Sequence, residues 1–372
     1  MTGNITQGDD CYDPRAVVRA PRELFCYEPR KLQWRQIDDQ KLTATQARLE
    51  FRYGAAKHGT ERMLYQGQVF VRGDYDRDLK LFRKNPSRDG FRPYVVGNLV
   101  VGEVVEMGEA VEGLSRGDRV LCGGGFRERR VIDASRLGQL DLRKMPPGLA
   151  WQSAVCLDPT LFALAALRDG QVRLGDTVAV FGLGALGLIA VQLAKAMHAG
   201  LVVAVDPIQE RRAIAAELGA DLLVDPTQGD VAEIVRDHNG GKGMDVAIEM
   251  SGSAAAMQAA VRATHYGGTV VAAAAPTSYN AGLDLGGDAH FNCLNFVFSR
   301  GCSEPNREHP RWDMQRLYDV SWSLIRAGVV SGTRIVDRIV EFDSLAEAYD
   351  TILDENRAIK LGARMSAAST GE

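Results

Sequence analysis

The chain has 372 residues, of which 45% are hydrophobic and 25% are charged, and its formal net charge is −4. This length allows two or three domains, each with a full hydrophobic core. The slightly acidic balance leaves no basic surface of the kind that nucleic acid requires, and no apolar run approaches the roughly 20 residues that span a bilayer. We therefore expect neither a nucleic-acid partner nor a membrane segment.

Cysteine usage and the first residues bear on where the protein works. The six cysteines are scattered, and no two of them have the C-x-x-C spacing of a structural zinc lobe. The N-terminal residues lack a cationic start followed by an apolar stretch, so we expect no signal peptide. The sequence thus predicts reduced thiols and a cytoplasmic protein.

The first third of the chain predicts short strands. Residues 1–20 are polar and are expected to form an irregular arm. The segments RELFCY and KLQWRQI flank Glu28-Pro29-Arg30, which predicts a hairpin. ARLEFRY alternates apolar and polar residues, and NLVVGEVVEMG and DRVLCGG continue the strand-rich pattern. This pattern is typical of a β-barrel-like domain.

From Ala154 onward, strands and helices alternate. Six apolar segments predict buried strands: TVAVF, LVVAV, DLLVD, MDVAIEM, TVVAAAA and LNFVFS. Helical patterns begin between them near Ala185, Ile208, Asp230 and Ala254, while the last link shows no clear helix. The pair Gly267-Gly268 is expected to end the fourth of these helices. Such alternation predicts an α/β domain with a doubly wound parallel sheet of six strands.

The most informative motif follows the first of these strands. It consists of Gly182, Leu183, Gly184, Ala185, Leu186 and Gly187, and it opens a helical pattern. The first glycine of such a G-x-G-x-x-G motif allows a tight turn, the second the approach of a pyrophosphate, and the third close packing of helix on strand. The N–H groups of the helix start then face the phosphates. The motif predicts a Rossmann domain with a bound dinucleotide.

The choice of cofactor depends on Asp206, which ends the second strand 19 residues beyond the last glycine. A carboxylate there hydrogen-bonds a ribose 2′-hydroxyl and repels a 2′-phosphate, which predicts NAD. Arg211 and Arg212 complicate this prediction, because an arginine can bind a phosphate, and Arg211 is itself expected near the cofactor. Ser251 and Ala275 follow two later strands, whose carboxyl ends line the ligand crevice.

The stretch 22–366 resembles the medium-chain dehydrogenase/reductase superfamily, which includes the zinc alcohol and sorbitol dehydrogenases. The stretches that carry the resemblance are AKHGTERMLYQG, PYVVGNLVVGEVVEMGEAVEGLSRGDRV, LDPTLFALAAL, VRLGDTVAVFGLGALGLIAVQLAKAMHAG and FDSLAEAYDTI with IKLGARM. The resemblance implies a GroES-like catalytic domain made from residues 1–157 and 304–372, with a Rossmann domain at 158–303 between them. It also implies an active site in the cleft and a homodimer or homotetramer.

Three positions depart from the zinc-dependent members. HGTE stands where they carry CGTD, GNL where they carry GHE, and DP where sorbitol-type members carry EP, so the ligand positions hold His58, Asn98 and Asp158. Catalytic zinc needs three good protein ligands, and neither Asn98 nor Leu99 is one. The resemblance therefore points to a branch without the usual zinc ligands, and we expect no metal. A divalent ion held by His58 and Asp158 and completed by the substrate is the alternative.

Without a metal, side chains must provide the route for the proton of an alcohol. Thr60 aligns with the hydroxyl residue that relays the proton in zinc alcohol dehydrogenases, and His58 titrates near neutral pH when unperturbed. Asp158 could orient His58 or accept the proton itself, as could Glu61. Each has a structural alternative: a hydrogen-bonded His58, helix caps at Thr60 and Asp158, and an arginine partner for Glu61.

The predicted function is NAD-dependent oxidation of a secondary alcohol of a polyol, a sugar or a similar polar molecule. One alternative is an NADPH-dependent quinone or enone reductase, against which Asp206 argues. The other is a non-catalytic NAD-binding module, against which His58 and Thr60 argue.

Overall fold

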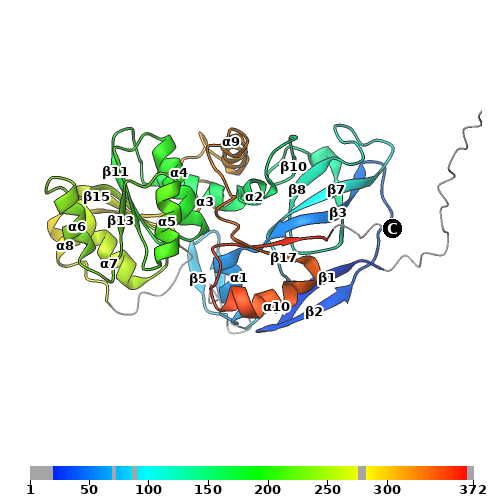
Figure 1. Cartoon of the computed structure of the whole chain (residues 1–372), viewed down its shortest axis with the longest axis horizontal. Coiled ribbons are helices and arrows are strands. Elements are labelled where there is room, and N and C mark those ends of the chain that lie inside the picture. The colour runs from blue at the N-terminus through cyan, green and yellow to red at the C-terminus, as the bar shows by residue number, and fades with distance from the viewer. Residues whose placement is uncertain (1–19, 69–72, 86–89, 275–281, 367–372) are drawn as a thin grey trace, which may run out of the picture.

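The computed structural model of the chain describes residues 20–68, 73–85, 90–274 and 282–366. It has two lobes, one built from both ends of the chain and one from its middle (Figure 1). Most of the expected N-terminal arm lies outside the described residues, as does the predicted cofactor contact Ala275. No helix within the described ranges is long and apolar enough to cross a membrane.

The lobe at the right of Figure 1 is organised around a seven-stranded sheet in the order β10-β8-β7-β3-β18-β17, with β9 paired to β3. Strand β18, near the C-terminus, pairs antiparallel with β3, so both ends of the chain share one sheet. The strands are β3 (Gln46–Ala55), β7 (Leu99–Met107), β8 (Arg119–Gly123), β9 (Arg129–Asp133), β10 (Arg143–Lys144), β17 (Arg338–Glu341) and β18 (Leu361–Arg364).

Smaller sheets complete this lobe. Strands β1 (Arg22–Glu28) and β2 (Lys31–Gln36) form the predicted hairpin, and β6 (Tyr94–Val95) pairs with β1. Strands β4 (Asp74–Asp76) and β5 (Leu81–Arg83) form another hairpin. Alternate residues of a strand point to opposite faces, and strands such as β1 and β3 turn one face to the core of the lobe. Its buried side chains include Leu24, Leu49, Phe51, Val104, Phe126 and Phe342.

The other lobe contains a six-stranded parallel sheet in the order β13-β12-β11-β14-β15-β16. The chain reverses direction across the sheet between β11 and β14, which creates the switch point where ligands of such sheets bind. The strands are β11 (Thr177–Phe181), β12 (Leu201–Val205), β13 (Leu222–Val224), β14 (Met244–Glu249), β15 (Thr264–Ala272) and β16 (Asn295–Phe298).

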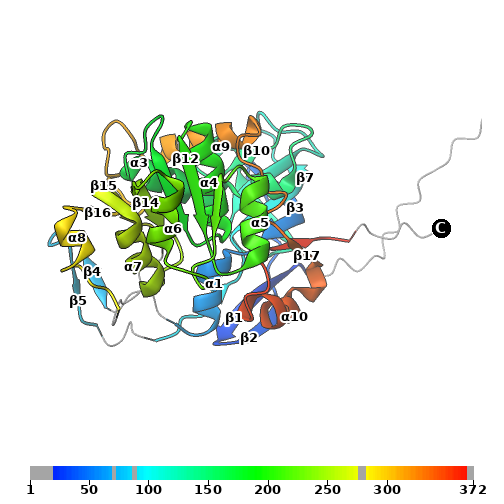
Figure 2. The ribbon, with the colours of Figure 1, turned by 60° about the vertical axis from the view of Figure 1, so that its left-hand side comes forward.

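Different helices cover the two faces of this sheet. Val178 and Val180 of β11 belong to the core that includes α3 and α4, whereas Ala179 and Phe181 belong to the core that includes α6 and α7. Figure 2 shows α4 and α5 alongside the green strands. The helices of this lobe are α3 (Leu157–Asp169), α4 (Ala185–Ala196), α5 (Gln209–Glu217), α6 (Val231–His238), α7 (Ala254–Ala263) and α8 (Asp288–Phe291).

The remaining helices belong to the stretches on either side of the nucleotide lobe in sequence. Helix α3 packs against α4 and α9, and α1 contacts the turn η4 that follows α10. These elements are α1 (His58–Tyr65), η2 (Ala134–Arg136), α2 (Trp151–Ala154), α9 (Met314–Arg326), η3 (Phe342–Ser344), α10 (Leu345–Ala348) and η4 (Tyr349–Asp354).

The fourth predicted helix ends earlier than expected. Helix α7 stops at Ala263, and Gly267-Gly268 lies within β15 instead of ending the helix. Thr264 already pairs with Met244 of β14, so the strand begins directly after the helix, and Thr264 and Tyr266 are residue types that favour strands. The last link also contains the short helix α8, which the pattern did not indicate.

Candidate active site and cofactor-binding turn

The glycines of the motif have distinct local environments. Gly182 directly follows β11 with φ +90°, and a Cβ added to it would lie 2.8 Å from the Cβ of Ser251. A Cβ on Gly187 would lie 1.9 Å from the carbonyl oxygen of Gly182, whereas nothing lies within 4 Å of a Cβ on Gly184. Gly182 and Gly187 are thus required by the fold of the turn. Gly184 leaves open space in front of the helix, as a diphosphate would need.

The start of α4 is free to receive an anion. Gly184 is the N-cap residue, and no side chain caps the helix there. The first helical hydrogen bond runs from the N–H of Leu188 to the oxygen of Gly184, at 3.0 Å. The backbone N–H groups of Ala185 and Leu186 therefore lie in the first turn, where the helix dipole favours a negative group.

Asp206 ties the turn to the neighbouring strand. It is 4% exposed, and its carboxylate accepts hydrogen bonds from the N–H of Leu183 at 2.7 Å and from the N–H of Ile208 at 2.9 Å. A carboxylate offers about four lone-pair sites, so acceptor capacity remains for the ribose hydroxyls. The geometry places Asp206 beside the glycine turn, where the sequence predicts it.

Ser251 lies on the other side of the switch point, next to Gly182. The fully buried Glu249, at the end of β14, accepts hydrogen bonds from the N–H of Ser251 at 2.6 Å and of Gly252 at 2.9 Å. Burial raises the pKa of Glu249, although these hydrogen bonds act in the opposite direction. The buried carboxylate thus fixes the backbone at the position where Ser251 would contact a cofactor.

Helix α1 presents His58, Glu61 and Tyr65 to the core, at the spacing of one helix face. The wholly buried carboxylate of Glu61 accepts from the backbone N–H of Lys57 at 2.8 Å, from the Tyr349 hydroxyl at 3.0 Å, and from the N–H of Gly97. Burial raises the pKa of Glu61, while these donors counteract the rise. The partners of Glu61 are these donors and not an arginine, and they fasten the helix start to its surroundings.

His58 is 8% exposed, and its Nε2 lies 3.3 Å from Oδ1 of Asn356. Its Nδ1 is buried and has no hydrogen-bond partner among the described residues. Burial, together with the positive charges of Arg211 and Lys360, lowers the pKa of His58 to about 4, although the hydrogen bond with Asn356 acts in the opposite direction. His58 is therefore neutral near pH 7, with Nδ1 available as an acceptor when Nε2 carries the proton.

Arg211 connects the two lobes. This residue of α5 donates from Nη2 to Oδ1 of Asn356 at 3.4 Å, the same oxygen that contacts His58. Its neighbour Arg212 points elsewhere: it pairs with Asp225 at 2.9 Å and donates to the backbone oxygen of Asp206. The predicted cofactor contact Arg211 thus lies between the nucleotide lobe and the catalytic histidine predicted from the sequence.

Asp158 lies in the first turn of α3, and its two oxygens have two different partners. The ammonium of Lys57 donates to Oδ1 at 2.9 Å, and the amide of Asn98 donates to Oδ2 at 3.0 Å. The Nζ atom of Lys57 also lies 4.7 Å from the centroid of the Phe162 ring. These partners of Asp158 do not include His58, so the structure gives no support to the expectation that Asp158 orients the histidine.

The structure does not use Thr60 or Asp158, the two residues considered as helix caps, in that role. Lys57 is the N-cap of α1 and Cys156 that of α3, so neither Thr60 nor Asp158 is a cap. Thr60 is half-buried in the first turn of α1, two residues after His58. Its role as a relay stays a prediction.

Several polar residues near this cluster were missed in the sequence. Lys360 is 2% exposed and donates to the backbone oxygen of Ala56 at 2.7 Å, and burial lowers its pKa. Burial raises the pKa of Asp141 and that of Tyr318, and the negative charge of Asp158 contributes to both. Asp141 and Tyr318 lie outside the segments that carry the family resemblance, and Lys360 lies in one of them, IKLGARM, without any pattern that marks it as a buried cation.

The residues at the three ligand positions do not fit a catalytic zinc ion. Asp158 is already paired with the ammonium of Lys57, and the amide of Asn98 donates to the same carboxylate. In the ranges that the structure describes, no three His, Cys, Asp or Glu side chains gather closely enough to hold a metal. The site thus offers fewer than the three good ligands that such an ion needs.

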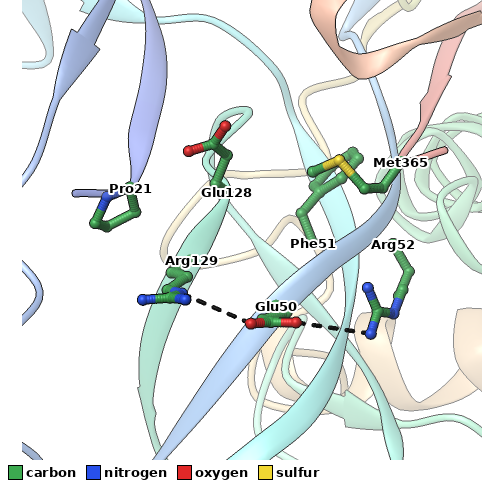
Figure 3. Close-up of a pocket in the computed structure, with 7 residues that line it drawn as sticks. All are labelled: Pro21, Glu50, Phe51, Arg52, Glu128, Arg129 and Met365. Atoms are coloured by element: carbon green, nitrogen blue, oxygen red, sulfur yellow. Dashed lines mark ion pairs between the residues drawn. The ribbon is translucent and has the colours of Figure 1, made fainter. Parts of the chain in front are cut away.

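A separate hollow of about 220 Å³ lies on the catalytic lobe (Figure 3). Glu50 lies between two arginines there, 3.7 Å from Arg52 and 3.7 Å from Arg129. The acids and arginines balance one another, and no predicted site residue lines the hollow. Its lining consists of Pro21, Glu50, Phe51, Arg52, Glu128, Arg129 and Met365.

Comparison with known proteins places this geometry in a family. The family model of the alcohol dehydrogenase GroES-like domain matches residues 69–143, and that of the zinc-binding dehydrogenases matches residues 185–308. The D-guloside 3-dehydrogenase of Escherichia coli (strain K12) is 38% identical over 348 residues, which cover 92% of this chain and 99% of that protein.

Solved structures agree on the fold. A putative zinc-binding dehydrogenase from Sinorhizobium meliloti 1021, bound to NADP, is 20% identical with a TM-score of 0.72, over 93% of this chain and 99% of that chain. An alcohol dehydrogenase from Escherichia coli CFT073, complexed with NADH, is 20% identical with a TM-score of 0.68, over 93% and 99%. The GroES-like and Rossmann architecture predicted from the sequence is thereby confirmed. The chain therefore belongs to the medium-chain dehydrogenase/reductase superfamily, the pyridine-nucleotide-dependent family of alcohol and polyol dehydrogenases.

Proposed function

We propose that this protein oxidises a secondary alcohol of a glycoside, sugar or polyol and transfers the hydride to NAD. The observation that carries the proposal is the link between the dinucleotide lobe and the candidate site: Arg211 of α5 and His58 of α1 meet on the same oxygen of Asn356. The lobe that would hold the dinucleotide, with its diphosphate at the glycine turn, is thus in contact with the His58 cluster through Arg211 and Asn356. The similarity to D-guloside 3-dehydrogenase supports a sugar-like substrate.

NAD as the cofactor is supported by the surroundings of Asp206. Its buried carboxylate would lie against the 2′-phosphate of NADP, and the repulsion between two negative groups that water does not separate is unfavourable. Arg212 is engaged by Asp225 and by the backbone of Asp206, so it offers little to a phosphate. Arg211 is engaged by Asn356 at the lobe boundary. The charges at this edge thus favour the free 2′-hydroxyl.

We propose that the proton of the alcohol goes to Nδ1 of His58, directly or through the hydroxyl of Thr60. The histidine is neutral near pH 7 and its Nδ1 lacks a partner in the described structure. Its low pKa makes it a weak base, but a hydroxyl becomes strongly acidic as the hydride leaves its carbon, so a weak base suffices in a concerted step. Glu61, with its three donors, has a positioning role in this proposal, since it holds the start of α1.

We propose that the active site works without zinc, because the residues at the three ligand positions include fewer than three good zinc ligands.

We also propose a homodimer or homotetramer, because β16 is the terminal strand of its sheet and large aromatic side chains lie exposed on or near it. These are Tyr266, Phe291 and Phe298, with exposed fractions of 68%, 79% and 74%. A cytoplasmic location suits the five cysteines of the described residues, which are all free thiols.

The test is the absorbance of reduced nicotinamide with the purified protein, both cofactors and a panel of methyl glycosides, free sugars, hexitols and enones. We expect alcohol-dependent reduction of NAD by at least one glycoside or polyol, with slower reduction of NADP. Oxidation of NADPH by enones alone would favour the reductase alternative. Saturable NAD binding without turnover of any compound would favour the non-catalytic alternative.

A further inference from the structure

The ion pair between Lys57 and Asp158 joins two elements that meet at the lobe boundary. Lys57 is the N-cap residue of α1, and Asp158 lies in the first turn of α3, 101 positions later in the chain. The Nζ–Oδ1 distance is 2.9 Å, and the side chains are 34% and 14% exposed. The carboxylate is thus mostly withdrawn from water, while part of the lysine remains accessible.

The ammonium is held on two sides and open on a third. Asp158 accepts one of its three N–H donors, and the face of the Phe162 ring lies 4.7 Å from Nζ. Asn98 donates to the other oxygen of Asp158 and so fixes the carboxylate that holds the lysine. A pre-oriented cation with donors left over is the arrangement that stabilises negative charge on a reacting oxygen.

The state of the neighbouring titratable groups leaves the ammonium of Lys57 as a suitable hydrogen-bond donor to the oxygen of a substrate. His58, the next residue, is neutral near pH 7 because burial lowers its pKa to about 4. The buried ammonium of Lys360 is used by the backbone oxygen of Ala56. Lys57 is therefore a partly exposed cation that directly precedes the proposed proton acceptor in the chain and is held by Asp158.

We propose that the ammonium of Lys57 is the group that polarises the oxygen of the substrate, in the place where zinc-dependent relatives use a metal ion, and that Asp158 positions it. The inference rests on the proposed function. In the oxidation, the C–H bond breaks and its electron pair moves with the hydride to the nicotinamide ring. The O–H bond breaks, the proton passes to His58, and the C=O bond forms. Lys57 donates a hydrogen bond to that oxygen throughout and keeps its own proton.

The principal variant is Lys57→Met, which retains most of the side-chain volume and removes the charge. Loss of one donor to a developing oxyanion lowers kcat by about 100-fold to 1,000-fold in other enzymes, so we expect a fall of about 100-fold or more in kcat. The dissociation constant of NAD, measured by fluorescence titration, should change by less than about twofold, since the contacts of the Lys57 ammonium are with Asp158 and Phe162 of α3 and not with the glycine turn. The deuterium isotope effect on the carbinol hydrogen should increase because hydride transfer becomes rate-limiting.

The matched control is Lys195→Met. Lys195 pairs with Asp221 at the same distance of 2.9 Å, and its side chain is 37% exposed, but it lies at the far end of α4. This variant should retain wild-type kcat. Lys57→Arg should retain part of the activity, because the charge remains with altered geometry. Lys57→Ala should be partly rescued by methylamine, which a loss of folding would not allow, and circular dichroism verifies the fold of each variant.

The metal content of the wild-type enzyme gives an independent readout. We expect substoichiometric zinc by elemental analysis and full turnover after dialysis against a chelator. The inference is overturned if Lys57→Met keeps wild-type kcat, if folded Lys57→Ala is active without amine, or if chelation removes a stoichiometric metal together with the activity. In each of these cases the wild-type enzyme still oxidises an alcohol, so the proposed function stands. Absence of alcohol oxidation by the wild-type enzyme would instead overturn the proposed function and this inference with it.

Discussion

The carboxylate of Asp206 accepts a hydrogen bond of 2.7 Å from the backbone N–H of Leu183, inside the glycine turn. One carboxylate thus shapes the turn that would hold the diphosphate, and it lies beside the place that the adenosine ribose would occupy. Substitutions at Asp206 should therefore affect both cofactor choice and stability.

Asp206→Ala should weaken NAD binding by about tenfold, which corresponds to about 1.4 kcal/mol, and should reduce the preference for NAD over NADP. It should also lower the free energy of unfolding by about 1–3 kcal/mol, because the N–H groups of Leu183 and Ile208 lose their acceptor. Calorimetric titration with both cofactors and urea unfolding measure the two effects. An unchanged ratio of NAD to NADP affinity would exclude the proposed role of Asp206 in cofactor choice.

Two glycines of the turn provide a matched pair of substitutions. Gly187→Ala should destabilise the protein and abolish cofactor binding, because the new Cβ would lie 1.9 Å from the oxygen of Gly182 and the turn must move. Gly184→Ala meets nothing within 4 Å, and the φ of Gly184 is −73°, which alanine accepts without strain. This variant should keep the wild-type melting temperature and lose NAD affinity by about tenfold or more, as the Cβ would occupy the space of the diphosphate. Wild-type NAD affinity in folded Gly184→Ala would show that the phosphates lie elsewhere.

The nucleotide lobe could be predicted from the sequence because each of its signals is local. The strands are continuous apolar segments, and the turn requires glycine at Gly182 and Gly187. The end of α7 could not be predicted, because the pairing of Thr264 with Met244 in another strand decides it. A glycine pair in a helical pattern suggests a stop, yet here it lies inside β15.

The candidate site was only partly predictable, because contacts between residues far apart in the chain also decide which side chains belong to it. His58, Thr60 and Asp158 belong to segments that resemble a known motif. Lys57 lies in the first of these segments, but nothing in the sequence distinguishes it as a site residue, because its partner Asp158 is 101 positions away. Lys360 lies in the segment IKLGARM, but its burial could not be predicted, since lysine is normally a surface residue; only the fold shows that it is 2% exposed.

Asn356 links His58 with Arg211, and its removal should affect turnover more than cofactor binding. Asn356 has φ +58°, a conformation that glycine adopts without strain, so Asn356→Gly removes the amide and leaves the backbone conformation accessible. A hydrogen bond contributes about 1 kcal/mol, so kcat should fall by several-fold to about tenfold as the imidazole loses its orientation. The dissociation constant of NAD should change by less than about threefold. Steady-state kinetics and fluorescence titration measure both; unchanged kcat would mean that the orientation of His58 does not depend on Asn356.

Stability should depend on pH through His58. Burial lowers its pKa in the folded protein from 6.5 to about 4, so between these values the unfolded chain binds a proton that the folded protein does not. The contribution of His58 to the free energy of unfolding is therefore complete above pH 6.5 and is lost as the pH falls toward 4. Below pH 4 this histidine causes no further change in stability. The difference between the two pKa values is worth about 3 kcal/mol.

The measurement is urea unfolding of the wild-type protein and of His58→Gln at several pH values between 7 and 4. Buried carboxyl groups such as Glu61, Asp141 and Glu249, whose pKa values burial raises, also contribute to the pH dependence of stability, so the comparison uses the difference between the two proteins at each pH. Glutamine stays neutral at every pH of the series, so wild-type stability should decline more steeply on acidification than that of the variant, by about 3 kcal/mol over the whole range. Parallel curves would mean that His58 has the same pKa in the folded and unfolded states. The imidazole would then be solvated in the folded protein, and its proposed role as a neutral acceptor in a dry site would fail.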